Sequence, residues 1–449
     1  MYSKPHYAEC RGFRNVLFEV ACDAYRRYYT HMLTSMKNKS AAFLRRLDPY
    51  MKTDVMYLAT GGFWLMLGQI VGTAAGLALT LVFGNFVSKE VFGNYKYVLS
   101  LAGIFGAIAL TGMGSAVTQA VARGFDGALR EGFRTYLQWS IPSMFATLAG
   151  AVYYWANDNN VLALSLFIVA LGSPVLNACN LYTSFLQGKK DFRRNTIYGF
   201  LISSTPPLLL IATMLAGYVE WVPLFVLIYY IAMIAPSAYF HMRTRALYRP
   251  SNVIDVETAP YAWHLSLINV LGRIAAYIDK VLVFHFLGAA PLAIYTFASA
   301  PPQYVLKFNG IFRTLALPKL AARDIPTLKA TLPRKIALHF AVALAVLGVY
   351  EILVSPFFRF FLPQYIDAIP YAWALGLTIL SAPGVWLGQT LIAHMKKRAL
   401  YFMNTVSPII KMGLYVSLIP IYGIWGVVVA TVASGFIGFM IAAIIFKRL

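Results

Sequence analysis

The chain has 449 residues, of which 59% are hydrophobic and only 12% are charged, and its mean hydropathy is +0.64. A water-soluble domain of this length does not show this balance, so the composition indicates a polytopic membrane protein. A formal net charge of +21 would suggest nucleic-acid binding if Lys and Arg clustered in a soluble domain, but they lie mostly between apolar stretches.

Residues 1–52 precede the first apolar stretch and contain ten Lys and Arg residues. They lack the charged start, central apolar run and cleavage site of a signal peptide. Basic residues alternate with aromatic ones such as Phe18 and Tyr25, as in amphipathic helices that lie on an anionic leaflet. An ordinary extension, or a start upstream of a true start such as Met51, is an equally good interpretation. We predict a basic cytoplasmic tail.

Twelve apolar windows follow, each close to the roughly 20 residues that a spanning helix needs. They cover residues 57–83, 95–116, 136–156, 161–186, 196–219, 222–240, 263–287, 292–317, 336–355, 371–393, 401–420 and 423–446. The sequence therefore predicts an all-α polytopic membrane protein with twelve transmembrane helices.

The distribution of the 38 Lys and Arg residues predicts the orientation of these helices. Thirty lie in the two terminal segments and in the connections after the even-numbered windows, whereas the odd-numbered outer loops hold three: Lys89, Lys96 and Arg359. Because cytoplasmic loops retain positive charge, both termini are predicted to be inside the cell. A multi-pass protein of the bacterial cytoplasmic membrane follows, and nucleic-acid binding is excluded.

The two halves of the chain show traces of a duplication. At an offset of 200 residues, Tyr95 aligns with Tyr295 and Arg123 with Arg323. Each half holds six windows, so both halves enter and leave the membrane on the same side, as parallel repeats do. We predict two pseudo-symmetric six-helix lobes around a central cavity.

These boundaries define four segments. The expected segments are a tail at 1–52, an N-lobe at 53–242, a cytoplasmic linker at 243–262 and a C-lobe at 263–449.

Six ionisable residues interrupt the apolar windows, all in the second half of the chain: Arg273, Asp279, Lys280, Lys307, Arg313 and Lys411. An ionised group at membrane depth costs roughly 2.5–3.5 kcal/mol even on lenient scales, so such groups normally face a wet cavity and a charged partner. No ionisable residue is predicted to lie deep within a window of the first half.

Arg273, Lys307 and Lys411 are each predicted to lie near the middle of the membrane, and Lys280 follows Arg273 on nearly the same helix face, with Tyr277 between them. Arg and Lys together suit a phosphate or pyrophosphate that must bind and then leave. We predict a substrate-binding role for Arg273, Lys307, Lys411, Lys280, Arg313 and Tyr277. The alternative is structural: Lys280 and Arg313 extend to the interfaces, and Asp279 neutralises one cation.

Asp279 admits two roles. A membrane carboxylate beside cations could bind a coupling H⁺ or Na⁺, but the adjacent Lys280 favours an ion pair. The three cysteines have no CxxC spacing, so no metal site is predicted. Walker A, His-Glu-x-x-His and nucleophile-elbow patterns are absent, so we expect no enzyme and no cofactor beyond a coupling ion.

The segment 267–298, with Arg273, Ile278-Asp279-Lys280, Phe286-Leu287-Gly288 and Ile294-Tyr295, resembles the seventh and eighth spans of bacterial polysaccharide-export flippases. This O-antigen and exopolysaccharide flippase family belongs to the multidrug, oligosaccharidyl-lipid and polysaccharide exporter superfamily. The resemblance extends from about residue 57 to the C-terminus, although the basic tail and a first half without deep charges depart from the usual pattern.

The resemblance implies two six-helix lobes, alternating access, and movement of an undecaprenyl-pyrophosphate-linked oligosaccharide from the inner to the outer leaflet for surface polysaccharide biosynthesis. The lipid-linked glycan, membrane lipids and other polysaccharide-assembly proteins are the implied partners. Two alternatives remain open: a multidrug or cation exporter of the same superfamily, which would need an acidic cavity, and a membrane-embedded enzyme of polysaccharide assembly.

Overall fold

The computed structural model describes residues 55–251, 253–307, 310, 320 and 323–448, and the side chains from residue 67 onward. The chain divides into two compact units, Met1–Phe63 and Trp64–Leu449, and all packing discussed below lies within the second. The predicted N-terminal tail and Arg313 fall outside the described residues.

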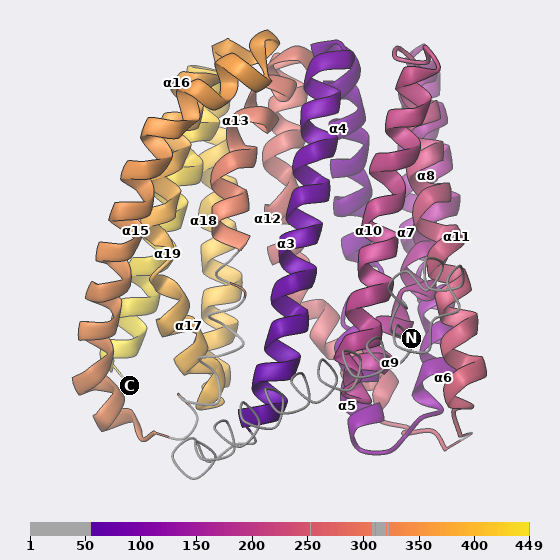
Figure 1. The fold of residues 1–449 in the computed structure, drawn as a ribbon, viewed down its shortest axis with the longest axis vertical. Helices are drawn as coiled ribbons and strands as arrows, with labels where there is room; N and C mark the ends of the chain where they lie inside the picture. The colour runs from indigo at the N-terminus through magenta and orange to yellow at the C-terminus, as the bar shows by residue number, and fades with distance from the viewer. Residues whose placement is uncertain (1–54, 252, 308–309, 311–319, 321–322, 449) are drawn as a thin grey trace, which may run out of the picture. The chain divides into compact units, whose positions relative to one another are not determined.

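The described residues form helices and no strand (Figure 1). In the first half the helices are α3 (Val55–Phe86), α4 (Lys89–Phe105), η2 (Gly106–Ile108), α5 (Met113–Ala122), α6 (Ala128–Trp139), α7 (Ile141–Ala156), α8 (Asn160–Cys179), α9 (Leu181–Gly188), α10 (Phe192–Leu215) and α11 (Val222–Tyr248). In the second half they are α12 (Thr258–Leu287), α13 (Ala289–Lys307), α15 (Ile325–Phe361), η3 (Pro363–Ala368), α16 (Ile369–Gly376), η4 (Leu377–Ser381), α17 (Gly384–Ala393), α18 (Lys397–Tyr422) and α19 (Ile424–Arg448).

Local sequence explains where several helices begin and end. Ser88 and Asn159 accept hydrogen bonds from backbone amides in the first turns of α4 and α8, as helix-capping residues do. Gly288 and Gly423 end α12 and α18 with positive φ angles of 92° and 57°, which glycine adopts at little steric cost.

Nine helical segments in the described residues are long and apolar enough to cross a membrane. The prediction of an all-α, multi-pass membrane protein is thereby confirmed. The windows at 136–156, 263–287 and 292–317 are not among the nine, although α7, α12 and α13 occupy them. Charged residues in α12 and a proline pair in α13 lower the apolarity of those helices, and the count of twelve stays a prediction.

Helix α4 connects the two halves of the chain. It packs against α12 and α13 on one side and against α7, α8 and α11 on the other (Figure 1). Aromatic pairs lie at this contact: the ring centroids are 3.7 Å apart in the stacked pair Tyr97 and Phe284 and 4.6 Å apart in the tilted pair Phe92 and Phe297. Such pairs contribute about 0.5–1.5 kcal/mol each beyond the burial of their surface.

The predicted window at 95–116 is not one continuous helix. The chain leaves helical geometry between η2 and α5, over residues 109–112. The amide of Gly112 donates to the Ser266 hydroxyl of α12 over 2.8 Å, so this amide keeps a hydrogen-bond partner although the helix is broken there. Helix breaks at membrane depth are tolerated where the backbone is buried in protein or lines a cavity.

Candidate functional site

Helix α12 packs against α4, α13 and α18, and these four helices carry four lysines that lie far apart in the sequence. Lys280 and Lys307 act electrostatically on Lys96, and Lys280 also acts on Lys411. We call Lys96, Lys280, Lys307 and Lys411 the lysine cluster. Lys307 is exposed and the other three are partly buried.

Lys96 was missed by the sequence interpretation, which placed it in an outer loop. That placement is wrong, because Lys96 lies about two turns inside α4, within a helical segment that is apolar enough to span a membrane. The expectation that no ionisable residue lies deep in the first half is wrong for the same reason. The duplication offers a signal that could have found it, because the neighbouring Tyr95 aligns with Tyr295 in the middle of the described part of α13.

Aromatic rings support three of the four ammonium groups. The Nζ atoms of Lys96, Lys307 and Lys411 lie 5.1, 4.8 and 5.5 Å from the ring centroids of Phe92, Tyr304 and Tyr415, respectively. A ring face attracts a cation by roughly 0.5–2 kcal/mol without neutralising its charge. The cations are therefore held in place while their positive potential remains available to a ligand.

Asp279 lies buried beside this cluster. The Tyr295 hydroxyl donates to its carboxylate over 2.7 Å, and the Lys280 ammonium lies 3.4 Å from the same oxygen. Asp279 also attracts Lys411. One carboxylate against four ammonium groups leaves the cluster with an excess of positive charge.

Arg273 and Tyr277 lie elsewhere on α12, at a pocket of about 450 Å³ that is also lined by α4, α5, α6, α8, α9 and α11. Four tyrosines line it, Tyr136, Tyr229, Tyr230 and Tyr277, and we call it the tyrosine pocket. Among the described residues that line it, Arg273 is the single charged one. The structure therefore separates Arg273 and Tyr277 from the lysine cluster, although the sequence placed Arg273 and Lys280 on one helix face.

Small residues set the position of the pocket rings. A Cβ atom on Gly103 of α4 would lie 2.6 Å from the Tyr277 ring, and one on Gly172 of α8 would lie 2.6 Å from the Tyr230 ring. These distances are too short for any other residue type, so the two rings rest on bare backbone. The chain segment around the break before α5 completes the lining with Thr111 and Gly114.

The chain matches a known protein family over much of its length. The model of the polysaccharide biosynthesis protein family matches residues 58–308, which is more than half of the 449 residues. The chain belongs to this family. The predicted relationship to polysaccharide-export flippases is thus confirmed at the level of family. No curated protein matches the chain.

Solved structures share the fold of this family member. An inward-facing multidrug resistance MATE transporter of the MOP superfamily has 14% sequence identity and a TM-score of 0.68, covering 84% of this chain and 95% of its own. An outward-facing structure of that kind has 14% identity and a TM-score of 0.60, covering 87% and 96%. A MOP superfamily transporter from Pyrococcus furiosus has 15% identity and a TM-score of 0.54, covering 87% and 96%. The chain is thus a member of the polysaccharide biosynthesis protein family with the fold of MOP superfamily transporters.

Proposed function

We propose that the protein is a flippase that moves an undecaprenyl-pyrophosphate-linked oligosaccharide from the inner to the outer leaflet by alternating access, for surface polysaccharide biosynthesis. The lysine cluster carries this proposal. Four ammonium groups with one carboxylate favour an anionic cargo, and a pyrophosphate offers oxygens to several of them at once. In this proposal the glycan itself is also acidic.

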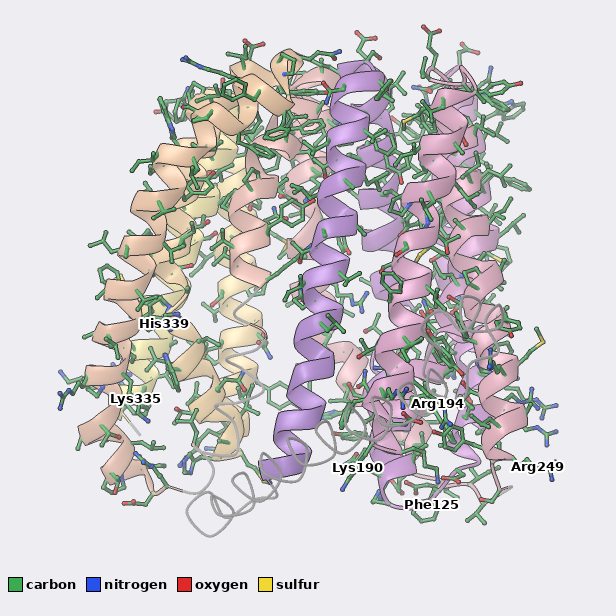
Figure 2. All side chains as sticks on the ribbon, viewed as in Figure 1. Phe125, Lys190, Arg194, Arg249, Lys335 and His339 are labelled. Carbon is green, nitrogen blue, oxygen red and sulfur yellow. The ribbon has the colours of Figure 1, made fainter. Side chains whose placement is uncertain are left out.

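Basic residues at one end of the described helices support an orientation in the bilayer. Lys190, Arg194, Arg249 and Lys335 gather in the lower part of the view, at one end of the described helices (Figure 2). They belong to the connections that the distribution of positive charge assigns to the cytoplasm. We therefore propose a cytoplasmic-membrane protein with both termini inside, in which the lysine cluster receives pyrophosphate from the inner leaflet.

A drug or cation exporter is disfavoured by the same charges, because a cationic cargo needs a carboxylate-rich cavity. For the transporter from Pyrococcus furiosus, a reversed polarity of the binding pocket is said to suggest a different function. In this chain Asp279 already pairs with Lys280. We assign Asp279 the role of a counter-ion and propose that any H⁺ or Na⁺ coupling uses another group.

Transport of a labelled undecaprenyl-pyrophosphate-linked oligosaccharide in vesicles tests the proposal. Lys96→Gln and Lys411→Gln should each slow transbilayer movement by about tenfold or more, because each removes one charge-assisted contact worth roughly 1.5–3 kcal/mol. Lys307→Ala and Arg273→Ala should likewise reduce surface polysaccharide in cells while leaving membrane insertion intact.

Lys89→Gln is the matched control. Lys89 lies on the same helix as Lys96 but pairs with the exposed Asp367, so its loss should change transport little. Wild-type rates in Lys96→Gln and Lys411→Gln would remove the cluster from the mechanism, and a new glycosidic product in the vesicles would identify an enzyme instead.

A further inference from the structure

The tyrosine pocket has a different chemistry from the lysine cluster. Apart from Arg273, its described polar lining consists of tyrosine, asparagine, serine and threonine, with no carboxylate. A pyrophosphate would find one cation there, and a drug cation would find no counter-ion. The pocket is therefore suited neither to a pyrophosphate nor to a drug cation, whereas its one guanidinium can pair with a single carboxylate or carbonyl.

The hydrogen bonds of two lining asparagines leave one donor and one acceptor free at the pocket. The Asn180 side-chain oxygen accepts from Ser237 over 2.9 Å, which directs its amide NH₂ away from Ser237 as a donor. The Asn177 NH₂ donates to the Ser173 carbonyl over 2.9 Å, which leaves its oxygen as an acceptor.

Hydroxyl groups that both donate and accept, next to apolar C–H faces, are the chemistry of a sugar ring. The free acceptor at Asn177 and the free donor at Asn180 complement the hydroxyls, and the fixed rings of Tyr230 and Tyr277 offer faces for the C–H groups. A volume of about 450 Å³ lies within the roughly 300–1,000 Å³ typical of small-molecule sites. The pocket can hold a short saccharide but not a long chain.

We infer that the tyrosine pocket is a sugar-recognition subsite that binds the first sugar residues of the lipid-linked glycan. This inference rests on the proposed flippase function. Two sites then bind two parts of the substrate: the lysine cluster binds the pyrophosphate of every cargo, and the tyrosine pocket binds its sugar. Arg273 then pairs with an acidic or carbonyl-bearing substituent on that sugar.

Two lipid probes separate the two parts of the site. Undecaprenyl pyrophosphate carries no sugar, and an undecaprenyl-pyrophosphate-linked oligosaccharide extracted from cells that make surface polysaccharide carries both parts. Dissociation constants are measured on the purified full-length chain by native mass spectrometry. We expect the wild type to bind the sugar-bearing probe about tenfold more tightly, a difference of roughly 1.4 kcal/mol.

Asn177→Ala removes the free acceptor and Tyr229→Phe removes one hydroxyl while keeping its ring. Each should weaken binding of the sugar-bearing probe by about five- to tenfold and leave binding of undecaprenyl pyrophosphate unchanged. Lys96→Gln should weaken binding of both probes by similar factors. Asn157→Ala is the matched control, because Asn157 also donates to a carbonyl four residues earlier, that of Tyr153, but lies outside the pocket.

The outcomes are distinguishable. Equal binding of the two probes by the wild type, or an unchanged or equally reduced affinity for both probes in Asn177→Ala and Tyr229→Phe, would overturn the sugar subsite and leave the flippase proposal standing. Failure of the wild type to bind either lipid would overturn the proposed function itself.

Discussion

Among single residues, Asp279 is distinctive because its buried carboxylate contacts two kinds of donor. Tyr295 donates a neutral hydrogen bond to it and Lys280 supplies a charge. A proton-coupling carboxylate and a structural counter-ion respond differently when the charge alone is removed. The amide of asparagine retains an acceptor for the tyrosine while losing the ion pair.

Asp279→Asn should lower the stability of the protein by about 1–3 kcal/mol, because Lys280 loses its neutralising partner and the lysine cluster becomes more repulsive. Thermal unfolding in detergent measures this change. Asp367→Asn, which breaks an exposed ion pair with Lys89, should alter the melting temperature little. Normal stability together with a complete loss of transport in Asp279→Asn would point to a coupling role instead.

The sequence identified some residues of the candidate site and missed another. Arg273, Lys280, Lys307 and Lys411 stand out because they interrupt apolar windows, and all four lie at the lysine cluster or the tyrosine pocket. Lys96 does not stand out, because it falls at the edge of a window where a loop and a helix have the same composition. Only its neighbours across the helix packing reveal it.

At the scale of elements, the connection between α9 and α10 shows how a cap joins two helices. Asp191 accepts from the Arg194 amide at the start of α10 over 3.0 Å and from the Tyr248 hydroxyl at the end of α11 over 2.5 Å. Burial tends to raise the pKa of Asp191, but hydrogen bonds from Tyr248 and Arg194 and the charge of Arg194 outweigh it, so its pKa lies below the ordinary value.

A carboxylate with a depressed pKa stabilises the folded state above its unfolded pKa of about 3.9 and loses this effect as the pH falls through its folded pKa. Asp191→Asn keeps a capping side chain but removes the charge. Its melting temperature should lie below that of the wild type at pH 7, by an amount equivalent to about 1 kcal/mol or less. This gap should shrink as the pH falls below about 4. A gap that stays constant over this range would contradict the assignment.

The break between η2 and α5 is the other informative element. Apolar composition continues through residues 109–112, so a hydropathy window cannot detect it. The break exists because α12 supplies Ser266 as a partner for the Gly112 amide, and it places Thr111 at the tyrosine pocket. The sequence predicted the helices but not this interruption, since the partner of its amide, Ser266, comes 154 residues later in the chain.

At the scale of the whole molecule, the contact between α4 and α13 joins the first and second halves of the chain. A Cβ atom on Gly93 would lie 2.0 Å from the Ala289 carbonyl oxygen. The carbonyl oxygen belongs to the backbone and a Cβ atom is bonded directly to it, so neither can move without moving its helix. An alternating-access protein must open and close contacts between its halves. The contact at Gly93 leaves no room for a side chain at that position.

Gly93→Ala should push α4 and α13 apart and lower the melting temperature, by an amount equivalent to about 1–3 kcal/mol, because overpacking costs this much in a close-packed interior. Transport should fall in parallel. Gly199→Ala in α10 is the matched control, because a Cβ atom there meets nothing within 4 Å, and it should leave stability unchanged or slightly raise it. Wild-type stability of Gly93→Ala would show that the contact is not tight.

The sequence by itself determined that the protein is helical and spans the membrane several times, and it predicted an anionic cargo. Hydropathy predicted membrane-spanning helices, because the bilayer core tolerates only segments that satisfy their own backbone, and charges within those segments predicted an electropositive site. Only the tertiary structure decided that Lys96 joins the lysine cluster, that Arg273 faces a separate tyrosine pocket, and that glycines position its rings. These facts depend on contacts between helices distant in the chain, and composition along one helix carries no information about which neighbour it meets.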